Sequence, residues 1–289
     1  MSSTSAPQTA RIRWHTWALL AAVIVVGGYF RTLNLTGWDG TSDLHPDERF
    51  IIYTTYNLRV PHSFADYLRS DCVRDGVLPN AKATEEGGQP IPLDRQEPTT
   101  DSGCNTLNPR NYNWSRFFVY GTLPTTLTRI VAEALQPLWG EPGQLVGPES
   151  VRNTGRALST LFDLGSVALV FLIGRRLYDE RVGLLGALLL ALSALPIQLA
   201  HFFTVDSFTG FFVLLAVYWT VRAMQGGGAL SFTMLGVSIG AAMACRFTMA
   251  TLGLLGIVAV AVRLWEGRRP EHALSAGEVA GGHTLATGE

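Results

Sequence analysis

The stretch ALLAAVIVVGGYF, residues 18–30, is the apolar centre of a longer run that contains no Asp, Glu, Lys or Arg. That run extends from Trp14 to Phe30, and Arg13 and Arg31 bound it. A run of this length, apolar at its centre and basic at its ends, is typical of a transmembrane helix. A cleaved signal peptide is the rival interpretation, because basic residues precede the run. We favour an uncleaved membrane anchor, since no small-x-small cleavage site follows and further apolar runs come later.

The composition of the whole chain is that of a membrane protein. Of the 289 residues, 47% are hydrophobic and only 16% are charged, whereas about a quarter of the residues in soluble domains are charged. The formal net charge of −1 gives no indication of nucleic-acid binding. Cys72 and Cys104 share one polar segment, where a disulfide and two free thiols are both compatible with the sequence, and Cys245 lies in an apolar run.

Five further apolar runs follow a long polar stretch from Thr32 to Arg116. Each run is near the lower length limit for a spanning helix, so its ends must include flanking residues. The sequence therefore predicts an all-α, polytopic membrane helix bundle with about six transmembrane helices. The five runs are Ala157–Gly174, Val182–Ala200, Ser207–Val221, Ala229–Cys245 and Phe247–Val262.

One segment before these five runs is ambiguous. FFVYGTLPTTLTRIVAEALQPLW, residues 117–139, is long enough to span a membrane but contains Arg129, Glu133 and several helix breakers. The positive-inside rule decides, because the alternative placements send the arginine clusters to opposite sides. If the segment lies on the membrane surface, the cytoplasmic ends carry the clusters Arg11/Arg13, Arg175/Arg176/Arg181, Arg222 and Arg263/Arg268/Arg269. We therefore predict that residues 117–139 include a helix at the membrane interface.

This choice predicts the domain organisation. Residues 1–13 form a cytoplasmic N-terminus, residues 14–30 the first transmembrane helix, and residues 31–156 one large exoplasmic loop with short interfacial helices. Residues 157–262 form transmembrane helices 2–6. Residues 263–289 form a cytoplasmic tail, which is rich in Gly, Ala and Glu and which we expect to be disordered.

Polar residues from three separate segments converge on the predicted exoplasmic side. HPDER, His45–Arg49, follows the first helix, while His201 and Asp206 lie in the turn AHFFTVD and Arg246 lies in the next exoplasmic turn. Adjacent carboxylates such as Asp47 and Glu48 are often merely solvated, but beside a bilayer they can serve as a general base or a metal ligand.

Arg246 separates two apolar runs and is the cation in the turn opposite the arginine-rich side. It is either a cap that reaches the interface or a clamp for an anionic group such as a phosphate. His201 and Asp206 alone are too few to define a metal site. Asp163 falls inside a predicted helix, where it needs either a role in a site or an internal partner.

Several stretches, taken in order, resemble the GT-C superfamily of polytopic glycosyltransferases. FRTLNLTGWDGTSDLHPDE is similar to the end of the family's first helix and its Asp-Glu motif, and FVYGTLPTTLTRIVAEAL is similar to its juxtamembrane segment. GVSIGAAMACRFTMATLGLLGIV resembles a later passage, with Arg246 where a lysine is more usual. The nearest branch resembles the protein O-mannosyltransferases and aminoarabinose transferases, which use phospholipid-carried sugars. The resemblance covers about residues 14–265, whereas family members usually have ten or more spanning helices.

The resemblance implies a membrane glycosyltransferase that moves a sugar from a polyprenyl-phosphate donor to an acceptor at the exoplasmic face, with inversion. Asp47 would be the catalytic base, and Glu48 would position the acceptor or tune Asp47. Arg246 would stabilise the leaving phosphate, with or without a divalent metal ion. The expected substrate-binding residues are His45, Arg49, His201, Asp206, Arg246 and Tyr120.

The expected setting is the bacterial plasma membrane, with several passes through the lipid and the site on the outer face. The acceptor, which can be a protein, a glycan or a lipid, and a second subunit that supplies further helices are left open. We expect no nucleic-acid partner. Two alternatives to an enzyme are a non-catalytic module that binds the lipid carrier or a partner, as in a truncated or split GT-C protein, and a small transporter.

Overall fold

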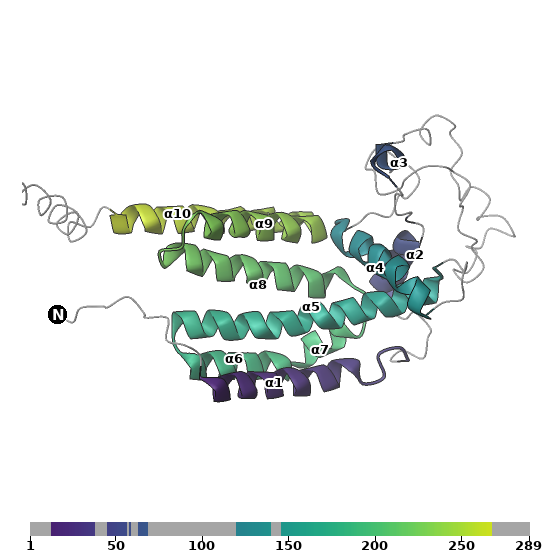
Figure 1. Cartoon of the computed structure of the whole chain (residues 1–289), viewed down its shortest axis with the longest axis horizontal. Coiled ribbons are helices and arrows are strands. Elements are labelled where there is room, and N and C mark those ends of the chain that lie inside the picture. The colour runs from purple at the N-terminus through teal and green to yellow at the C-terminus, as the bar shows by residue number, and fades with distance from the viewer. Residues whose placement is uncertain are drawn as a thin grey trace, which may run out of the picture.

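The computed structural model describes residues 13–37, 45–56, 58, 63–68, 120–139 and 146–267. Every regular element in these residues is a helix, and most of the helices lie side by side in one bundle (Figure 1). The predicted fold class, an all-α membrane helix bundle, is confirmed. The bundle helices are α1 (Trp14–Thr32), α5 (Pro148–Leu177), α6 (Glu180–Ala191), α7 (Ala194–Ala200), α8 (Val205–Met224), α9 (Ala229–Cys245), the 3-10 helix η5 (Phe247–Leu252) and α10 (Gly253–Gly267).

In the described part of the chain, three of the six predicted spans are long and apolar enough to cross a membrane as single units: α5, α8 and the stretch Phe247–Trp265. The number is four if the bent pair α6–α7 is counted as one span. The apolar helix α9 has 17 residues, about 26 Å at the helical rise of 1.5 Å per residue, which is shorter than the hydrocarbon core. Helix α1 has 19 residues but includes polar residues at both ends, which lower its mean hydropathy.

The predicted run Val182–Ala200 is not one straight helix. It consists of α6 and α7, which meet at a bend of 59°. Pro196 lies in the first turn of α7, and a proline there has no N–H to donate and clashes with the carbonyl four residues earlier. The helical hydrogen bonds of α6 therefore cannot continue into α7, and the prediction of a continuous span was wrong at this point.

The end of α1 is fastened to this bend by Arg31. The side chain of Arg31 is fully buried and forms an ion pair with Asp163 of α5. It also donates hydrogen bonds to the backbone carbonyls of Ala191 (2.7 Å) and Leu190 (3.3 Å), at the end of α6. Asp163 thus has the internal partner that an intramembrane carboxylate needs, and the ion pair connects α1, α5 and α6.

Three short helices gather at one end of the bundle: α2 (Pro46–Tyr56), α3 (Phe64–Leu68) and α4 (Leu123–Trp139) (Figure 1). Helix α4 is amphipathic: it buries Thr128 and Ala132 while Leu138 is exposed. It lies across this end of the bundle, as predicted for a helix within residues 117–139, and it is not among the helices that could span a membrane.

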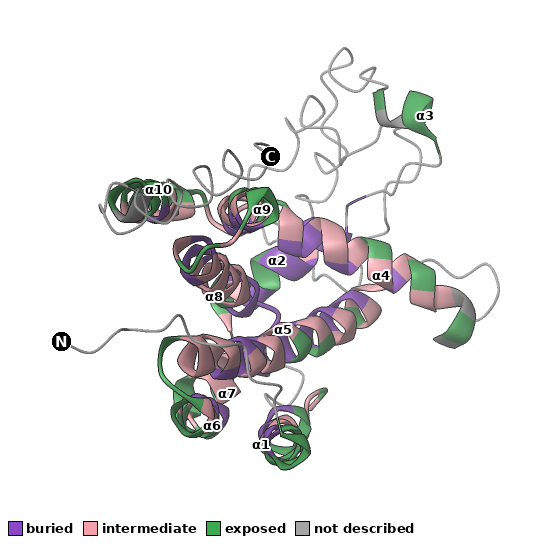
Figure 2. Ribbon diagram, turned by 60° about the vertical axis from the view of Figure 1, so that its left-hand side comes forward, coloured by how far each residue is buried: buried purple, intermediate pink, exposed green. Residues whose placement is uncertain are grey.

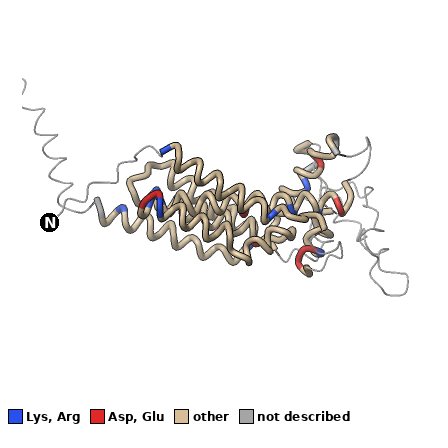
Figure 3. The backbone as a smooth tube through the Cα atoms, turned by 90° about the horizontal axis from the view of Figure 1, so that it is seen from below, with Lys and Arg blue, Asp and Glu red and all other residues tan. Residues whose placement is uncertain are grey.

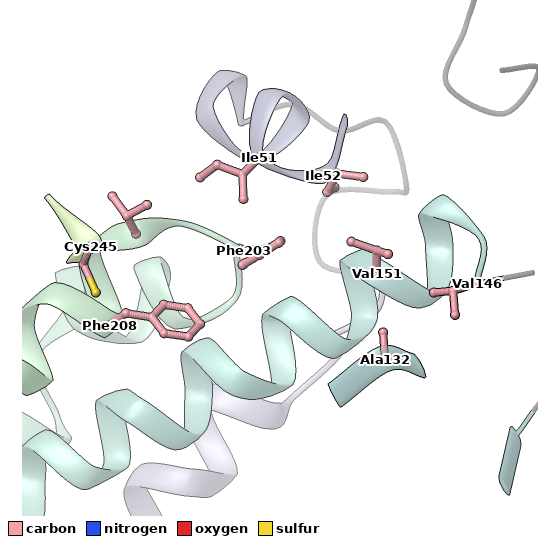
Figure 4. Packing of buried hydrophobic residues seen from close by; sticks show 9 residues of the cluster. Ile51, Ile52, Ala132, Val146, Val151, Phe203, Phe208 and Cys245 are labelled. Atoms are coloured by element: carbon pink, nitrogen blue, oxygen red, sulfur yellow. The ribbon is translucent and has the colours of Figure 1, made fainter. Parts of the chain in front are cut away.

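A hydrophobic cluster joins α2 to the bundle (Figure 4). Ile51 and Ile52 of α2 face Phe203 and Val151 across this cluster, and all four are buried. Because α2 has several buried side chains among its eleven residues, burial of apolar surface holds this short helix in place. The first turn of α2 is thereby fixed relative to α5 and α8.

Charged residues lie mostly at the two ends of the bundle, and its middle is nearly free of them (Figure 3). The end opposite α2 carries arginines at helix termini, namely Arg13, Arg175, Arg176, Arg181, Arg222 and Arg263. Burial follows the same arrangement: α5 and α8 bury the sides that face other helices, whereas α10 is largely exposed (Figure 2). Cys72, Cys104, Arg11, Arg268 and the tail beyond residue 267 fall outside the described residues.

Candidate active site

Four residues from four separate segments meet beside α2. Asp47 lies in the first turn of α2, Tyr120 just before α4, Asp206 in the first turn of α8, and Arg246 directly after α9. Tyr120 interacts electrostatically with the three others. The sequence predicted all four as site residues, and the fold brings them into one cluster.

Tyr120 connects Asp47 to Arg246. Its hydroxyl is within hydrogen-bonding reach of the Asp47 carboxylate, and the Arg246 guanidinium lies 5.4 Å from the centre of its ring. Burial, followed by the hydrogen bond and the charge of Asp47, raises the pKa of Tyr120 above its usual value of 10.0, although Arg246 opposes the shift. A protonated hydroxyl at this position can donate a hydrogen bond toward Asp47.

Arg246 and Asp206 form an ion pair at 2.9 Å, and both side chains are about one-third exposed. The Nε atom of Arg246 is buried and has no hydrogen-bond partner among the described residues. A guanidinium with an unused donor beside an accessible carboxylate can bind an anion such as a phosphate. A cation in this position can thus act as a clamp without leaving its ion pair with Asp206.

Glu48 differs sharply from its neighbour Asp47. It is fully buried and accepts two hydrogen bonds from Arg156 of α5, each 2.7 Å. Its Oε1 also accepts a hydrogen bond from the backbone N–H of Phe203 at 2.7 Å. Asp47 is half-buried. The two adjacent carboxylates therefore have different roles: Glu48 anchors the first turn of α2, and Asp47 is presented at the surface of the cluster.

Arg156 is the residue that the sequence interpretation missed. Besides Glu48, it donates to the backbone carbonyl of Leu35 at 3.2 Å and lies 5.7 Å from the ring centre of Phe202. The ring of His45 packs on the same phenylalanine at 4.9 Å. The sequence did contain one indication of this role. Arg156 directly precedes the predicted run Ala157–Gly174, a position from which a cation can pair with a buried acid.

The other predicted site residues have less direct placements. His201 is fully buried, and its two ring nitrogens lie 2.8 Å from the Ile197 carbonyl and 3.1 Å from the Leu33 carbonyl. This position connects α7 to the end of α1 and does not support the prediction that His201 contacts a substrate. Arg49 is exposed on α2, and the Nδ1 atom of His45 is buried without a partner among the described residues.

A divalent metal ion was predicted as an option for this site. In the part of the chain that the structure describes, no three His, Cys, Asp or Glu side chains converge as a metal site would require. Asp47 and Asp206 are the two carboxylates of the cluster, and Arg246 lies next to Asp206. The residues of the cluster thus fit an anion held by a cation better than they fit a metal ion.

Comparison with known proteins finds one family model that resembles part of the chain. Residues 149–276 match the model described as dolichyl-phosphate-mannose-protein mannosyltransferase. This match supports a relationship to the membrane glycosyltransferases of the GT-C type, which use a lipid-linked sugar donor. No curated protein and no solved structure matched the chain significantly.

The matched segment covers only part of the cluster. Arg156, Asp206 and Arg246 lie within it, whereas Asp47 and Tyr120 precede it. The match agrees with the resemblance to the GT-C superfamily that the sequence stretches predicted.

Proposed function

We propose that this protein transfers a sugar from a polyprenyl-phosphate donor to the hydroxyl or amine of an acceptor at the exoplasmic face of the membrane. The observation that carries this proposal is the half-buried Asp47, which shares Tyr120 as a neighbour with Arg246, while the adjacent Glu48 is held in a buried ion pair. A base and a cation on opposite sides of one reacting carbon are what this reaction needs.

In the proposed step, Asp47 accepts the proton of the acceptor group as that group attacks the anomeric carbon. The bond from the acceptor oxygen or nitrogen to the anomeric carbon forms while the bond from that carbon to the phosphate oxygen breaks. The polyprenyl phosphate leaves with the electron pair. A single direct displacement of this kind inverts the anomeric centre through an oxocarbenium-like transition state.

Arg246 stabilises the charge that develops on the leaving phosphate. Its buried Nε donor lacks a partner among the described residues, and its ion pair with Asp206 orients the guanidinium. Donors aimed at a developing oxyanion typically contribute a factor of about 10²–10³ to the rate. Glu48 acts on the reaction only through the position of Asp47.

The proposed orientation places the site on the outer side of a bacterial plasma membrane. Support comes from the arginines at the opposite end of the bundle, because positively charged residues accumulate on the cytoplasmic side. The nature of the sugar and of the acceptor is not part of the proposal.

The experiment that tests the function replaces Asp47 with Asn. Purified protein in lipid nanodiscs is supplied with radiolabelled mannosyl polyprenyl phosphate and a bacterial membrane extract as the acceptor source, and both transferred label and released polyprenyl phosphate are measured. Loss of the general base should lower the rate by roughly 10²–10⁴. Glu149→Gln is the matched control, because that carboxylate lies at the same end of the bundle and is 78% exposed. Undiminished transfer by Asp47→Asn would end the assignment of the base.

A second candidate function is a non-catalytic module that binds the lipid carrier or a membrane partner. The stretch Phe247–Trp265 favours it, because only 6% of that segment is buried, compared with 39% for α5 and for α8. In this case wild-type protein and Asp47→Asn should both retain polyprenyl phosphate in nanodiscs, and neither should release it from the mannosyl donor.

A further inference from the structure

Among the described residues, Tyr120 interacts with both the proposed base, Asp47, and the proposed phosphate clamp, Arg246. We infer that Tyr120 is a positioning residue, which orients Asp47 through its hydroxyl and Arg246 through its ring. The inference deepens the proposed function and rests on it. The support comes from the backbone around Tyr120, from its ring and from its hydroxyl, each considered in turn.

The backbone beside Tyr120 is fastened to the end of α9. The N–H of Gly121 donates to the carbonyl of Cys245 at 2.9 Å, and Cys245 directly precedes Arg246. A Cβ atom at Gly121 would lie 2.0 Å from the carbonyl oxygen of Ala244, so only glycine permits this close approach. Tyr120 is therefore held at a fixed position relative to Arg246 by the main chain, although the two are far apart in the sequence.

The ring of Tyr120 restricts the Arg246 side chain. The guanidinium lies 5.4 Å from the ring centre, within the range of a cation–π contact. Asp206 holds the same guanidinium at 2.9 Å through Nη2. With the ring on one side and the carboxylate on another, the guanidinium is held in place, and the part of the side chain that is 35% exposed remains available to an anion.

The hydroxyl of Tyr120 restricts Asp47. Hydrogen bonding from a protonated phenol selects one orientation of the carboxylate and leaves its other lone pairs for the acceptor's proton. The charged groups that face this hydroxyl are Asp47, Arg246 and Asp206; burial, Asp47 and Asp206 raise the pKa of Tyr120, and Arg246 opposes the rise. The base and the clamp are thus held at one separation by a single rigid side chain.

The two halves of this side chain can be tested separately. Tyr120→Phe keeps the ring beneath Arg246 and removes the hydroxyl. It should lower kcat about tenfold, the value of one hydrogen bond, while the KM for the mannosyl polyprenyl phosphate donor stays within twofold of wild type. Tyr120→Leu removes both the hydroxyl and the aromatic ring. It should lower kcat as Tyr120→Phe does, and it should also raise the donor KM roughly three- to fivefold, as expected for a lost cation–π contact.

Tyr178→Phe is the control for these variants. It should leave kcat and the donor KM unchanged, because Tyr178 is 75% exposed and lies after α5 at the other end of the bundle. Two results would refute the inference if Asp47→Asn is inactive. One is that Tyr120→Phe and Tyr120→Leu change kcat and the donor KM equally, and the other is that Tyr120→Phe has wild-type kinetics. Activity of Asp47→Asn would instead refute the proposed function itself.

A change in the backbone provides an independent check. Gly121→Ala should displace Tyr120 from the end of α9 and reproduce the combined loss of kcat and rise in KM seen for Tyr120→Leu. Gly147→Ala is its control, because nothing lies within 4 Å of a Cβ added there. Gly121→Ala protein that melts like wild type but keeps wild-type kinetics would also count against the role of Tyr120.

Discussion

At the residue scale, two neighbouring carboxylates with similar chemistry have different environments. Glu48 is removed from water, and its buried charge is tolerated because Arg156 and the Phe203 N–H neutralise it. Removing one partner from such a pair leaves the other charge buried and unpaired, which is far more costly than the pair itself. Asp47 remains half-buried and is the base in the proposed reaction.

We therefore predict that Glu48→Gln lowers the free energy of unfolding by about 3–5 kcal/mol. Thermal and denaturant unfolding in detergent measure this change. Glu133→Gln is the comparison: it breaks the pair of Arg129, 11% exposed, with Glu133, 32% exposed. It should cost less than Glu48→Gln, because Arg129 keeps its hydrogen bond to the Tyr56 carbonyl. A double variant, Glu48→Leu with Arg156→Met, should recover much of the loss. Equal stability of Glu48→Gln and wild type would mean that this ion pair does not anchor α2.

At the element scale, the start of α5 decides where the site lies. The helix begins at Pro148 with Gly147 as its N-cap residue, so Arg156 stands on a rigid helix and not in a loop. Gly155, one residue earlier, packs directly against the ring of Phe203: a Cβ there would lie 2.2 Å from Cγ of that ring. Helix α5 and the turn before α8 therefore meet at a contact that only glycine allows.

Gly155→Ala should push the Phe203 ring aside and disturb the hydrogen bond from its N–H to Glu48. We expect a loss of about 1–3 kcal/mol of stability, the usual cost of overpacking, together with reduced sugar transfer. Gly210→Ala in α8 is the control, since nothing lies within 4 Å of a Cβ added there, and alanine should stabilise that helix by about 0.5–1 kcal/mol. The measurements are the unfolding midpoint and the rate of sugar transfer of each variant. Similar values for Gly155→Ala and Gly210→Ala would contradict the proposed contact between Gly155 and Phe203.

At the scale of the whole molecule, the two ends of the bundle differ in chemistry. One end carries α2, α4 and the candidate site, and the other carries arginines at the helix termini. Because the potential and the lipid composition of a membrane favour basic residues on the cytoplasmic side, this asymmetry predicts the orientation of the protein.

Cysteine labelling tests this orientation. In a chain with Cys72 and Cys104 replaced by Ser, the substitutions Glu149→Cys and Tyr178→Cys place a thiol at each end of the bundle, since both side chains are well exposed. A membrane-impermeant maleimide should label Glu149→Cys in intact bacterial cells and Tyr178→Cys only after permeabilisation. The reverse pattern would place the site on the cytoplasmic side.

The sequence alone determined the class of the protein and supplied the four residues of the candidate cluster. Apolar runs bounded by arginines indicated a helical membrane bundle, because the bilayer admits few other structures. The order of short motifs indicated the GT-C superfamily, and the polar residues between the runs included Asp47, Tyr120, Asp206 and Arg246. These features are local in the chain and can be read without knowing which helices touch.

Only the tertiary structure decided which of two adjacent carboxylates is buried. It also revealed Arg156 as the partner of Glu48, placed His201 beside the Leu33 carbonyl, and showed that Arg31 connects α1 to the end of α6. Such facts depend on pairs separated by more than a hundred positions, such as Glu48 and Arg156. Burial and ion pairing arise when distant segments pack, so no local pattern in the sequence can specify them.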